Sequence, residues 1–391
     1  MGNGSWMIFH FPPAPDSNHK IRYTPKIPEQ LRTIGVTGGR LHWSFPEGVD
    51  PVSYRVEDEA MAYCGQVIDD LTHLDMAICL MISPLPKEER GKNPTPKILE
   101  KYFAVWEQFC ETFKDKSHLL AMNPVIESHL WQPDPDKRTH YNGFLNECTK
   151  IFRRHNPTRI ISYKPWGAAS RFEFESLDLP FKGNEQGYFV CSGSGSYGLG
   201  QWWDYGIWSE YTLKDLLWQM MTQGKGKAEY GLHHALEFRK RTGIEFWVDH
   251  WHWSRDNRWS DQQQLVYIEH WLSTLRESGI ASAGPQAKVI WDEENEHFFT
   301  DDFTQSVLEL SKKYCWRTSL TIEISGLGTV SRDPASNSSD EYTYNTEVTL
   351  TATPDPGWRF QSWSSDLNKK TNPAQITMDS NKTVQAIFVR K

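Results

Sequence analysis

The densest group of side chains able to do chemistry is Val248–Trp253, which reads VDHWHW and follows an apolar strand pattern. His250 and His252 stand two positions apart, so on a strand they would share one face, as a pair of metal ligands does. No other His, Cys or Asp group in the sequence has ligand spacing, so we expect a hydrogen-bonded pair, no metal site and no cofactor. Trp251 and Trp253 would lie at a strand end, where indole rings can stack on sugars.

Aromatic side chains are unusually abundant, with 18 Trp, 15 Tyr and 19 Phe making up 13% of the chain. Sugar rings present apolar C–H faces that stack on flat aromatic side chains, although we expect at least half of these rings to fill the core. The segment Gly200–Tyr211, GQWWDYGIWSEY, combines polar and aromatic residues. We interpret it as a wall of a binding cleft that presents Trp202 and Trp203. The alternative is a loop packed over a rim.

Composition and motifs argue against several classes of function. The formal net charge of −8 disfavours binding nucleic acid or an anionic membrane, although a local basic cleft could still take an anionic substrate. No apolar run is long enough to span a membrane, and the first residues lack a signal-peptide pattern. The GSGSYGLG stretch lacks the Lys-Ser/Thr of a phosphate loop, and no Gly-x-Ser-x-Gly esterase motif occurs. The 6 cysteines have no CxxC spacing, so we expect free, buried thiols.

Residues 1–315 alternate strand and helix patterns. Val56–Leu74 is an amphipathic helix that leads into the apolar run Met76–Ile82, and further helices are expected at Lys97–Phe113 and Asn142–His155. This alternation predicts the α/β class and about eight units closed into a (β/α)₈ TIM barrel. Active sites of such barrels lie at the C-terminal ends of the strands, so the residues just past each apolar run are the candidates.

Three segments carry a resemblance to a known family. They are Lys26–Phe45, KIPEQLRTIGVTGGRLHWSF, His118–Glu127, HLLAMNPVIE, and Gly243–His250, GIEFWVDH. They resemble the second, fourth and seventh strands of clan A glycoside hydrolases, most closely the cellulase family, family five. The resemblance covers most of Lys26–Leu310 in pattern, and it implies a TIM barrel that cleaves the glycosidic bonds of a polysaccharide or oligosaccharide.

The resemblance also carries roles to individual positions. The general acid/base of the family's fourth strand falls on Glu127, and the nucleophile of the seventh strand falls on His250, directly after Asp249. The conserved Arg of the second strand falls on Arg40, which would orient carboxylates or bind substrate charge. Substrate contacts are expected from residues at the strand ends and in the aromatic segment: Arg40, His42, Trp43, Trp202, Trp203, Trp251 and Trp253.

Around Glu127 the sequence departs from the family, because Ile126 and Ser128 replace the usual Asn and Pro. A retaining glycosidase needs two carboxyl groups about 5–5.5 Å apart, and an inverting one needs about 6.5–9.5 Å. Asp249 could turn inward to supply the second carboxylate, against strict strand alternation. Otherwise Asp292 or Glu293, past the eighth strand, would supply it.

Two hypotheses of a different kind remain open. In one, His250 is a general base, Tyr197 an acid and Arg40 the group that neutralises a uronate carboxylate. That combination would make the protein a β-eliminating polysaccharide lyase. In the second hypothesis, catalysis is lost and the protein only binds a glycan.

The composition changes near Tyr314–Arg317, after which short period-two strand patterns predict a small all-β module over residues 316–391. Glu347–Pro354, EVTLTATP, and Ile376–Val384, ITMDSNKTV, resemble the divergent InlB-type B-repeat of bacterial surface and secreted proteins. The resemblance implies structural roles for Trp358 and Trp363. It also leads us to expect a secreted or cell-surface protein.

Overall fold

The computed structural model of the chain describes residues 5–11, 23–43, 48–82, 94–124, 135–163, 189–194, 238–250, 260–277, 281–283, 290–292, 294–315, 317–336 and 341–391. These residues belong to two compact units, Met1–Val307 and Leu308–Lys391. The unit boundary precedes the domain boundary at 315/316 that the sequence predicts, and it falls inside a helix.

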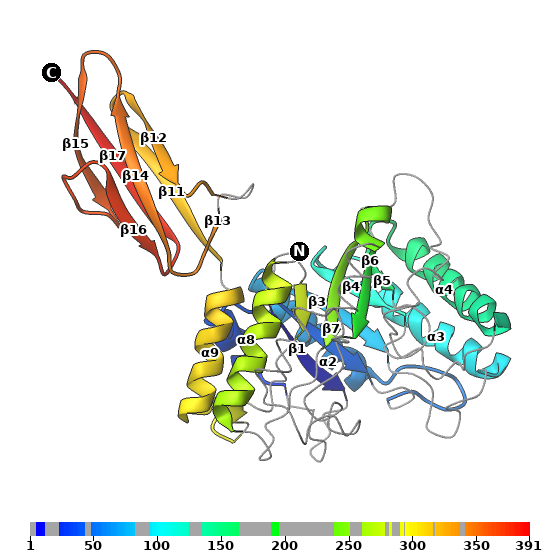
Figure 1. Cartoon of the computed structure of the whole chain (residues 1–391). Coiled ribbons are helices and arrows are strands. Elements are labelled where there is room, and N and C mark those ends of the chain that lie inside the picture. Colours follow the sequence, from blue (N-terminus) through cyan, green and yellow to red (C-terminus); the bar gives the residue numbers. More distant parts are fainter. Residues whose placement is uncertain are drawn as a thin grey trace. The chain divides into compact units, whose positions relative to one another are not determined.

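Eight parallel strands of the first unit pair in chain order and close into a barrel, because β1 pairs with β8 as well as with β2 (Figure 1). The strands are β1 (Ser5–Phe11), β2 (Gly38–Trp43), β3 (Ala77–Ile82), β4 (Leu120–Asn123), β5 (Ile160–Tyr163), β6 (Phe189–Ser194), β7 (Glu245–His250) and β8 (Ala281–Ala283). The segments that link β5 to β6 and most of β6 to β7 lie outside the described residues. The complete (β/α)₈ alternation therefore stays a prediction.

Helices fill most of the described connections between the strands. They are α1 (Lys26–Arg32), α2 (Asp58–His73), α3 (Pro96–Phe113), α4 (Pro135–His155), α8 (Asp261–Glu277) and α9 (Asp302–Cys315), and β9 (Trp291–Asp292) pairs antiparallel with β10 (His297–Phe298). The helices expected at Val56–Leu74 and Lys97–Phe113 are confirmed as α2 and α3. α3 begins where it does because the Thr95 side chain accepts a hydrogen bond from the Ile98 N–H and Pro96 occupies the first turn.

Strands β2 to β5 are buried along nearly their whole length on both faces, as parallel strands covered by helices are. Cys79 and Met81 of β3, Ala121 of β4 and Trp247 of β7 form one buried cluster. Because β7 pairs only with β6 and β8, its contact with β3 and β4 must cross the interior of the barrel. These residues therefore define the inward face of their strands.

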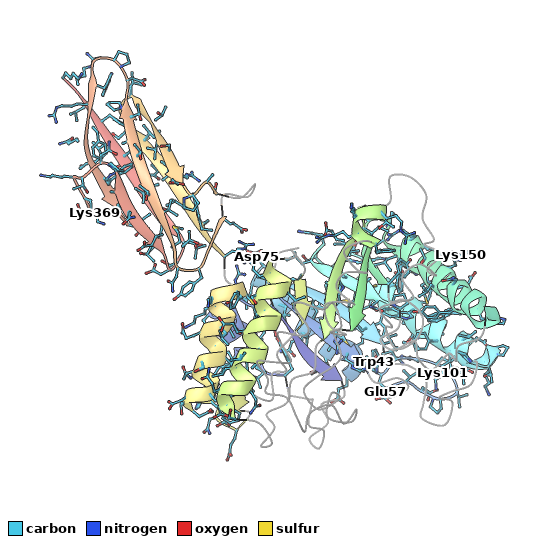
Figure 2. The ribbon with its side chains drawn as sticks, viewed as in Figure 1. Trp43, Glu57, Asp75, Lys101, Lys150 and Lys369 are labelled. Carbon is cyan, nitrogen blue, oxygen red and sulfur yellow. The ribbon has the colours of Figure 1, made fainter. Side chains whose placement is uncertain are left out.

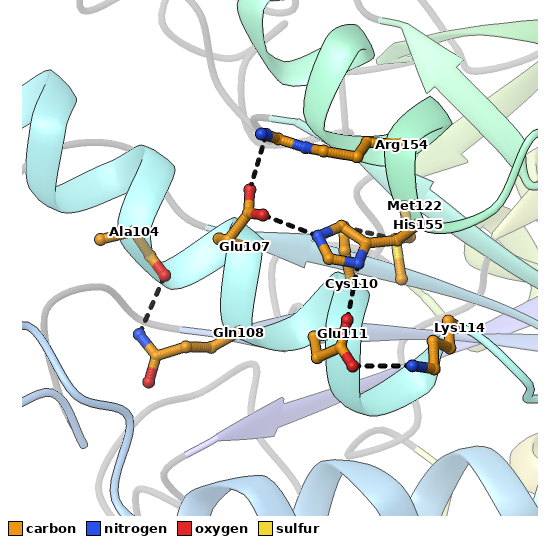
Figure 3. A network of polar contacts seen from close by, with 9 residues as sticks. All are labelled: Ala104, Glu107, Gln108, Cys110, Glu111, Lys114, Met122, Arg154 and His155. Atoms are coloured by element: carbon orange, nitrogen blue, oxygen red, sulfur yellow. Dashed lines mark hydrogen bonds and ion pairs between the residues drawn. The ribbon is translucent and has the colours of Figure 1, made fainter.

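A charged network joins α3 to α4 (Figure 3). The two ring nitrogens of His155 lie 2.7 Å from Glu107 Oε1 and 2.9 Å from Glu111 Oε2. Arg154 binds Glu107 at 2.9 Å, and Lys114 binds Glu111 at 2.7 Å.

After the last residues of α9, the second unit forms two sheets with strand orders β13-β11-β17-β15 and β12-β14-β16. Its strands are β11 (Arg317–Ser325), β12 (Gly328–Asp333), β13 (Glu341–Thr343), β14 (Thr346–Pro354), β15 (Trp358–Ser365), β16 (Ala374–Met378) and β17 (Lys382–Arg390). β11 and β17, the first and last strands, run parallel side by side. Trp363 is buried in the core and its indole N–H donates to the Thr371 carbonyl, whereas Trp358 packs against that core.

Five cysteines, Cys64, Cys79, Cys110, Cys148 and Cys315, are free and buried, as the sequence predicts, and Cys191 lies outside the described side chains. Among the described helices, none is both long enough and apolar enough to cross a membrane.

Candidate active site

The end of β2 divides its side chains between the two faces of the barrel wall. Arg40 pairs in register with Cys79, and His42 pairs with Met81, so these two positions share the inward face. Arg40 is 5% exposed and His42 is half-buried. A guanidinium and an imidazole from one strand are therefore brought to the inside of the barrel near its C-terminal edge.

Trp43 is a correction to the sequence analysis. Its side chain is 1% exposed and packs edge-on against Phe109 of α3, with ring centroids 4.3 Å apart (Figure 2 labels Trp43). It lies on the outward face of β2, opposite Arg40 and His42, because side chains alternate along a strand. A fully buried indole offers no face to a sugar ring, so Trp43 is a core residue.

Three polar side chains cross the barrel interior, and the sequence analysis missed all of them as site residues. Asn123, the last residue of β4, donates from Nδ2 to Ser162 Oγ of β5 across 3.4 Å. Ser162 Oγ also accepts from the indole N–H of Trp247 of β7 across 3.0 Å. The signal in the sequence was a polar residue at or near the end of an apolar strand run, LAMN in β4 and IISY in β5.

β4 ends at Asn123, earlier than the segment His118–Glu127 predicts. Pro124 follows, and a proline has no N–H with which to continue a ladder, so the strand stops although Val125 and Ile126 are apolar. Glu127 itself lies outside the described residues. The proposed acid/base thus follows the strand end by a short stretch of chain.

The end of β7 has an irregular register against β6. Gly193 pairs with Val248, but Ser194 pairs with His250, so Asp249 is the extra residue of a β-bulge. The side chains of Asp249 and His250 are outside the described part of the chain. Bulges are frequent at barrel rims and next to active sites.

Asp292 takes part in a turn instead of standing free as a second carboxylate. Its carboxylate accepts from the side-chain amide of Asn295 at 2.8 Å and from the backbone N–H groups of Glu294 and Asn295. These hydrogen bonds, led by that of the Asn295 side chain, lower the pKa of Asp292. The carboxylate is therefore committed to the β9–β10 turn.

The remaining candidates fall outside the described residues: Tyr197, Trp202, Trp203, Trp251, Trp253 and Glu293. Within the described residues, no group of three or more His, Cys, Asp or Glu side chains could hold a metal ion.

Comparison with solved structures finds barrels of similar shape. A glycoside hydrolase family 5 lichenase from Caldicellulosiruptor sp. F32, in complex with cellotetraose, superposes with a TM-score of 0.62 at 13% identity, covering 78% of this chain and 92% of its own. A broad-specificity endoglucanase from Clostridium longisporum gives 0.61 at 14% identity, over 80% of this chain and 97% of its own. A family 5 xyloglucanase from Paenibacillus pabuli gives 0.61 at 13% identity, over 79% and 98%. The first unit shares the fold of family 5 barrels.

The second unit is matched by a family model. Residues 318–391 match the divergent InlB B-repeat domain. This match confirms the resemblance of the C-terminal module. No curated protein sequence matches the chain.

Proposed function

We propose that the first unit is a glycosidase that cleaves a polysaccharide at the C-terminal ends of its barrel strands. The observation that carries this proposal is the closed parallel barrel, which aligns with nearly the whole length of family 5 endoglucanase, lichenase and xyloglucanase barrels. The polar residues Arg40, His42 and Asn123 on the inward side near this edge of the barrel add support.

Glu127 is the proposed general acid/base, which protonates the leaving oxygen. The second group across the glycosidic bond is Asp249 or His250. Trp247 lies on the inward face of β7, and alternation assigns position 249 to that same face. Alternation thus supports Asp249 as the carboxylate partner, whereas the bulge between Val248 and His250 breaks that alternation and pairs His250 with Ser194, which keeps His250 as the alternative.

Substrate would be held by charge and by aromatic stacking. Arg40 and His42 are proposed to contact the sugar nearest the reacting bond, because they lie on the inward face of the strand. The outer subsites are assigned to aromatic residues that follow in the loops: Trp202, Trp203, Trp251 and Trp253.

The divergent InlB B-repeat supports a role outside the cell or at its surface, as does the polysaccharide substrate proposed for the barrel. The module would then keep the barrel outside the cell or at the cell surface, where polysaccharides occur.

A panel of neutral and acidic polysaccharides tests the proposal, scored together for new reducing ends and for the ultraviolet absorbance of unsaturated uronates. We expect reducing ends without that absorbance. Absorbance would instead identify a lyase, with His250 and Tyr197 as its base and acid. Sugar binding without either signal would identify a glycan-binding protein and overturn the proposed reaction.

Substitutions assign the roles. Glu127→Gln should lower kcat more than about 100-fold with the fold intact, because a proton donor is lost. Glu59→Gln, at an exposed position of α2, is the matched control and should leave turnover unchanged. Asp249→Asn should lower kcat more than His250→Gln does, and the opposite order would exclude Asp249 as the partner.

A further inference from the structure

The carbonyl oxygen of Pro124, the first residue after β4, accepts two hydrogen bonds from side chains of α3. The Tyr102 hydroxyl donates across 3.1 Å, and the indole N–H of Trp106 donates across 3.2 Å. The same hydroxyl lies 3.4 Å from the carbonyl oxygen of Ile82, the last residue of β3. One helix therefore holds the ends of two neighbouring barrel strands.

Packing fixes both donors. Tyr102 and Trp106 are buried and stand one helical turn apart, so they lie on the same face of α3. Their rings pack against α4, with centroids 5.5 Å from Phe144 and 4.8 Å from Phe152 respectively. Burial raises the pKa of Tyr102 well above its ordinary value, so its hydroxyl keeps the proton that it donates.

The Pro124 carbonyl lies where the chain leaves β4, so its position affects the direction of the residues that follow. A buried backbone carbonyl needs a hydrogen-bond partner, and past the end of β4 the sheet no longer supplies one. Pro124 has a restricted φ, so fixing its carbonyl also fixes the direction in which the chain leaves the strand. Immediately before it, Asn123 reaches Ser162 in the barrel interior, and the chain after it leads to Glu127.

We propose that Tyr102 and Trp106 are positioning residues for the reaction at the end of β4. Without touching substrate, they hold the strand end from which Asn123 projects and from which the chain continues to Glu127. The expected effect on turnover rests on the proposed function. The claim that the two side chains hold the end of β4 rests only on their hydrogen bonds to Pro124.

Tyr102→Phe is the sharpest test because it removes one hydroxyl and leaves the ring. The matched control is Tyr23→Phe, which removes a hydroxyl that donates to Asp70 of α2 at 2.6 Å. Trp106→Phe removes the second donor and serves as a second variant if Tyr102→Phe folds poorly. Each variant is measured for kcat, KM and the pH profile of kcat, and for amide hydrogen exchange over residues 119–127.

For Tyr102→Phe we expect kcat to fall about 10-fold with KM little changed, because small misplacements of catalytic groups cost rate. The pH profile of kcat should shift, and exchange over residues 119–127 should be faster. Tyr23→Phe should show none of these changes.

Equal effects of the two Tyr→Phe substitutions on kcat and exchange would overturn the inference. If the wild-type protein turns over no polysaccharide, the proposed function fails by itself. Hydrogen exchange then decides whether Tyr102 and Trp106 hold the end of β4, and unchanged exchange in both variants would refute that too.

Discussion

The indole nitrogen of Trp247 in β7 lies 3.0 Å from the hydroxyl oxygen of Ser162 in β5, and this hydrogen bond crosses the inside of the barrel. β6 lies between the two strands in the sheet, so the bond joins strands that do not pair. Ser162 is also the acceptor for Asn123, which makes this hydroxyl the junction of three strands.

Breaking this junction should destabilise the barrel. In Ser162→Ala, the indole N–H of Trp247 and the amide of Asn123 lose their shared acceptor in a buried place. Losing buried hydrogen bonds of this kind costs about 1–3 kcal/mol, so we expect a lower free energy of unfolding and a lower thermal midpoint. Ser53→Ala, in an exposed loop, is the control and should cost less. Equal losses in the two variants would contradict the role of the junction.

Arg159 should be a main stabiliser of the barrel face opposite the proposed active site. Its guanidinium is buried and donates to five backbone carbonyls at and beyond the end of α3: Phe113, Lys114, Lys116, Ser117 and Leu120. Arg159→Met removes a buried group that donates five hydrogen bonds, so we expect a loss of roughly 3 kcal/mol in unfolding free energy, although Phe113, Lys114 and Ser117 keep other donors.

The surface substitution Arg154→Met, which breaks an exposed ion pair with Glu107, should cost about 1 kcal/mol or less. Thermal unfolding midpoints of Arg159→Met and Arg154→Met, each measured against the wild type, compare the two losses of stability. Activity per folded molecule should be unchanged in Arg159→Met, because Arg159 precedes β5 at its N-terminal end. A similar midpoint for the two variants would contradict this assignment.

The network of Figure 3 should make stability depend on pH in the acid range. The hydrogen bond and charge of Lys114, followed by His155, lower the pKa of Glu111. A carboxyl whose pKa is lower in the folded state binds protons less readily than in the unfolded chain. Its stabilising contribution is therefore complete above the ordinary carboxyl pKa of about 4.3 and is lost as the pH falls through the folded value.

Glu111→Gln should remove this contribution at neutral pH and leave stability nearly unchanged at the acid end. The difference in thermal midpoint between wild type and variant is then largest near pH 7 and shrinks towards pH 3. Glu147→Gln breaks an exposed i,i+3 pair with Lys150 alone and is the control for a simple surface pair. A midpoint difference that stays constant with pH would contradict the assignment to Glu111.

Much of the architecture could be predicted from the sequence, because the spacing of apolar residues indicates which side of a helix or strand is buried. The apolar run of β3 and the amphipathic pattern of α2 each predict their element to within a few residues. The all-β module was similarly visible in its alternating strands and its family motifs. Strand ends were harder: β4 ends at Asn123, directly before Pro124, although the next residues in the sequence are apolar.

The site was less predictable. Alternation along a strand tells which side chains share a face, but the sequence does not tell which of the two faces points into the barrel. The sequence predicts Trp43 as a residue that stacks on sugar. In the structure it lies on the outward face of β2, opposite Arg40, and packs against Phe109. From the sequence, strict alternation along β7 disfavours an inward Asp249. In the structure Trp247 packs inward, so alternation from Trp247 favours an inward position for Asp249. The hydrogen bonds from Tyr102 and Trp106 to the end of β4 join parts of the chain that no local pattern relates.

The parallel pairing of β11 with β17 has a consequence for anything attached to the second unit. Its first and last strands run in the same direction, so the polypeptide enters at one end of the unit and leaves at the other. Nine residues of strand extend about 30 Å. A cargo fused behind Lys391 would therefore be separated from the point where the chain enters the unit by about the length of one strand.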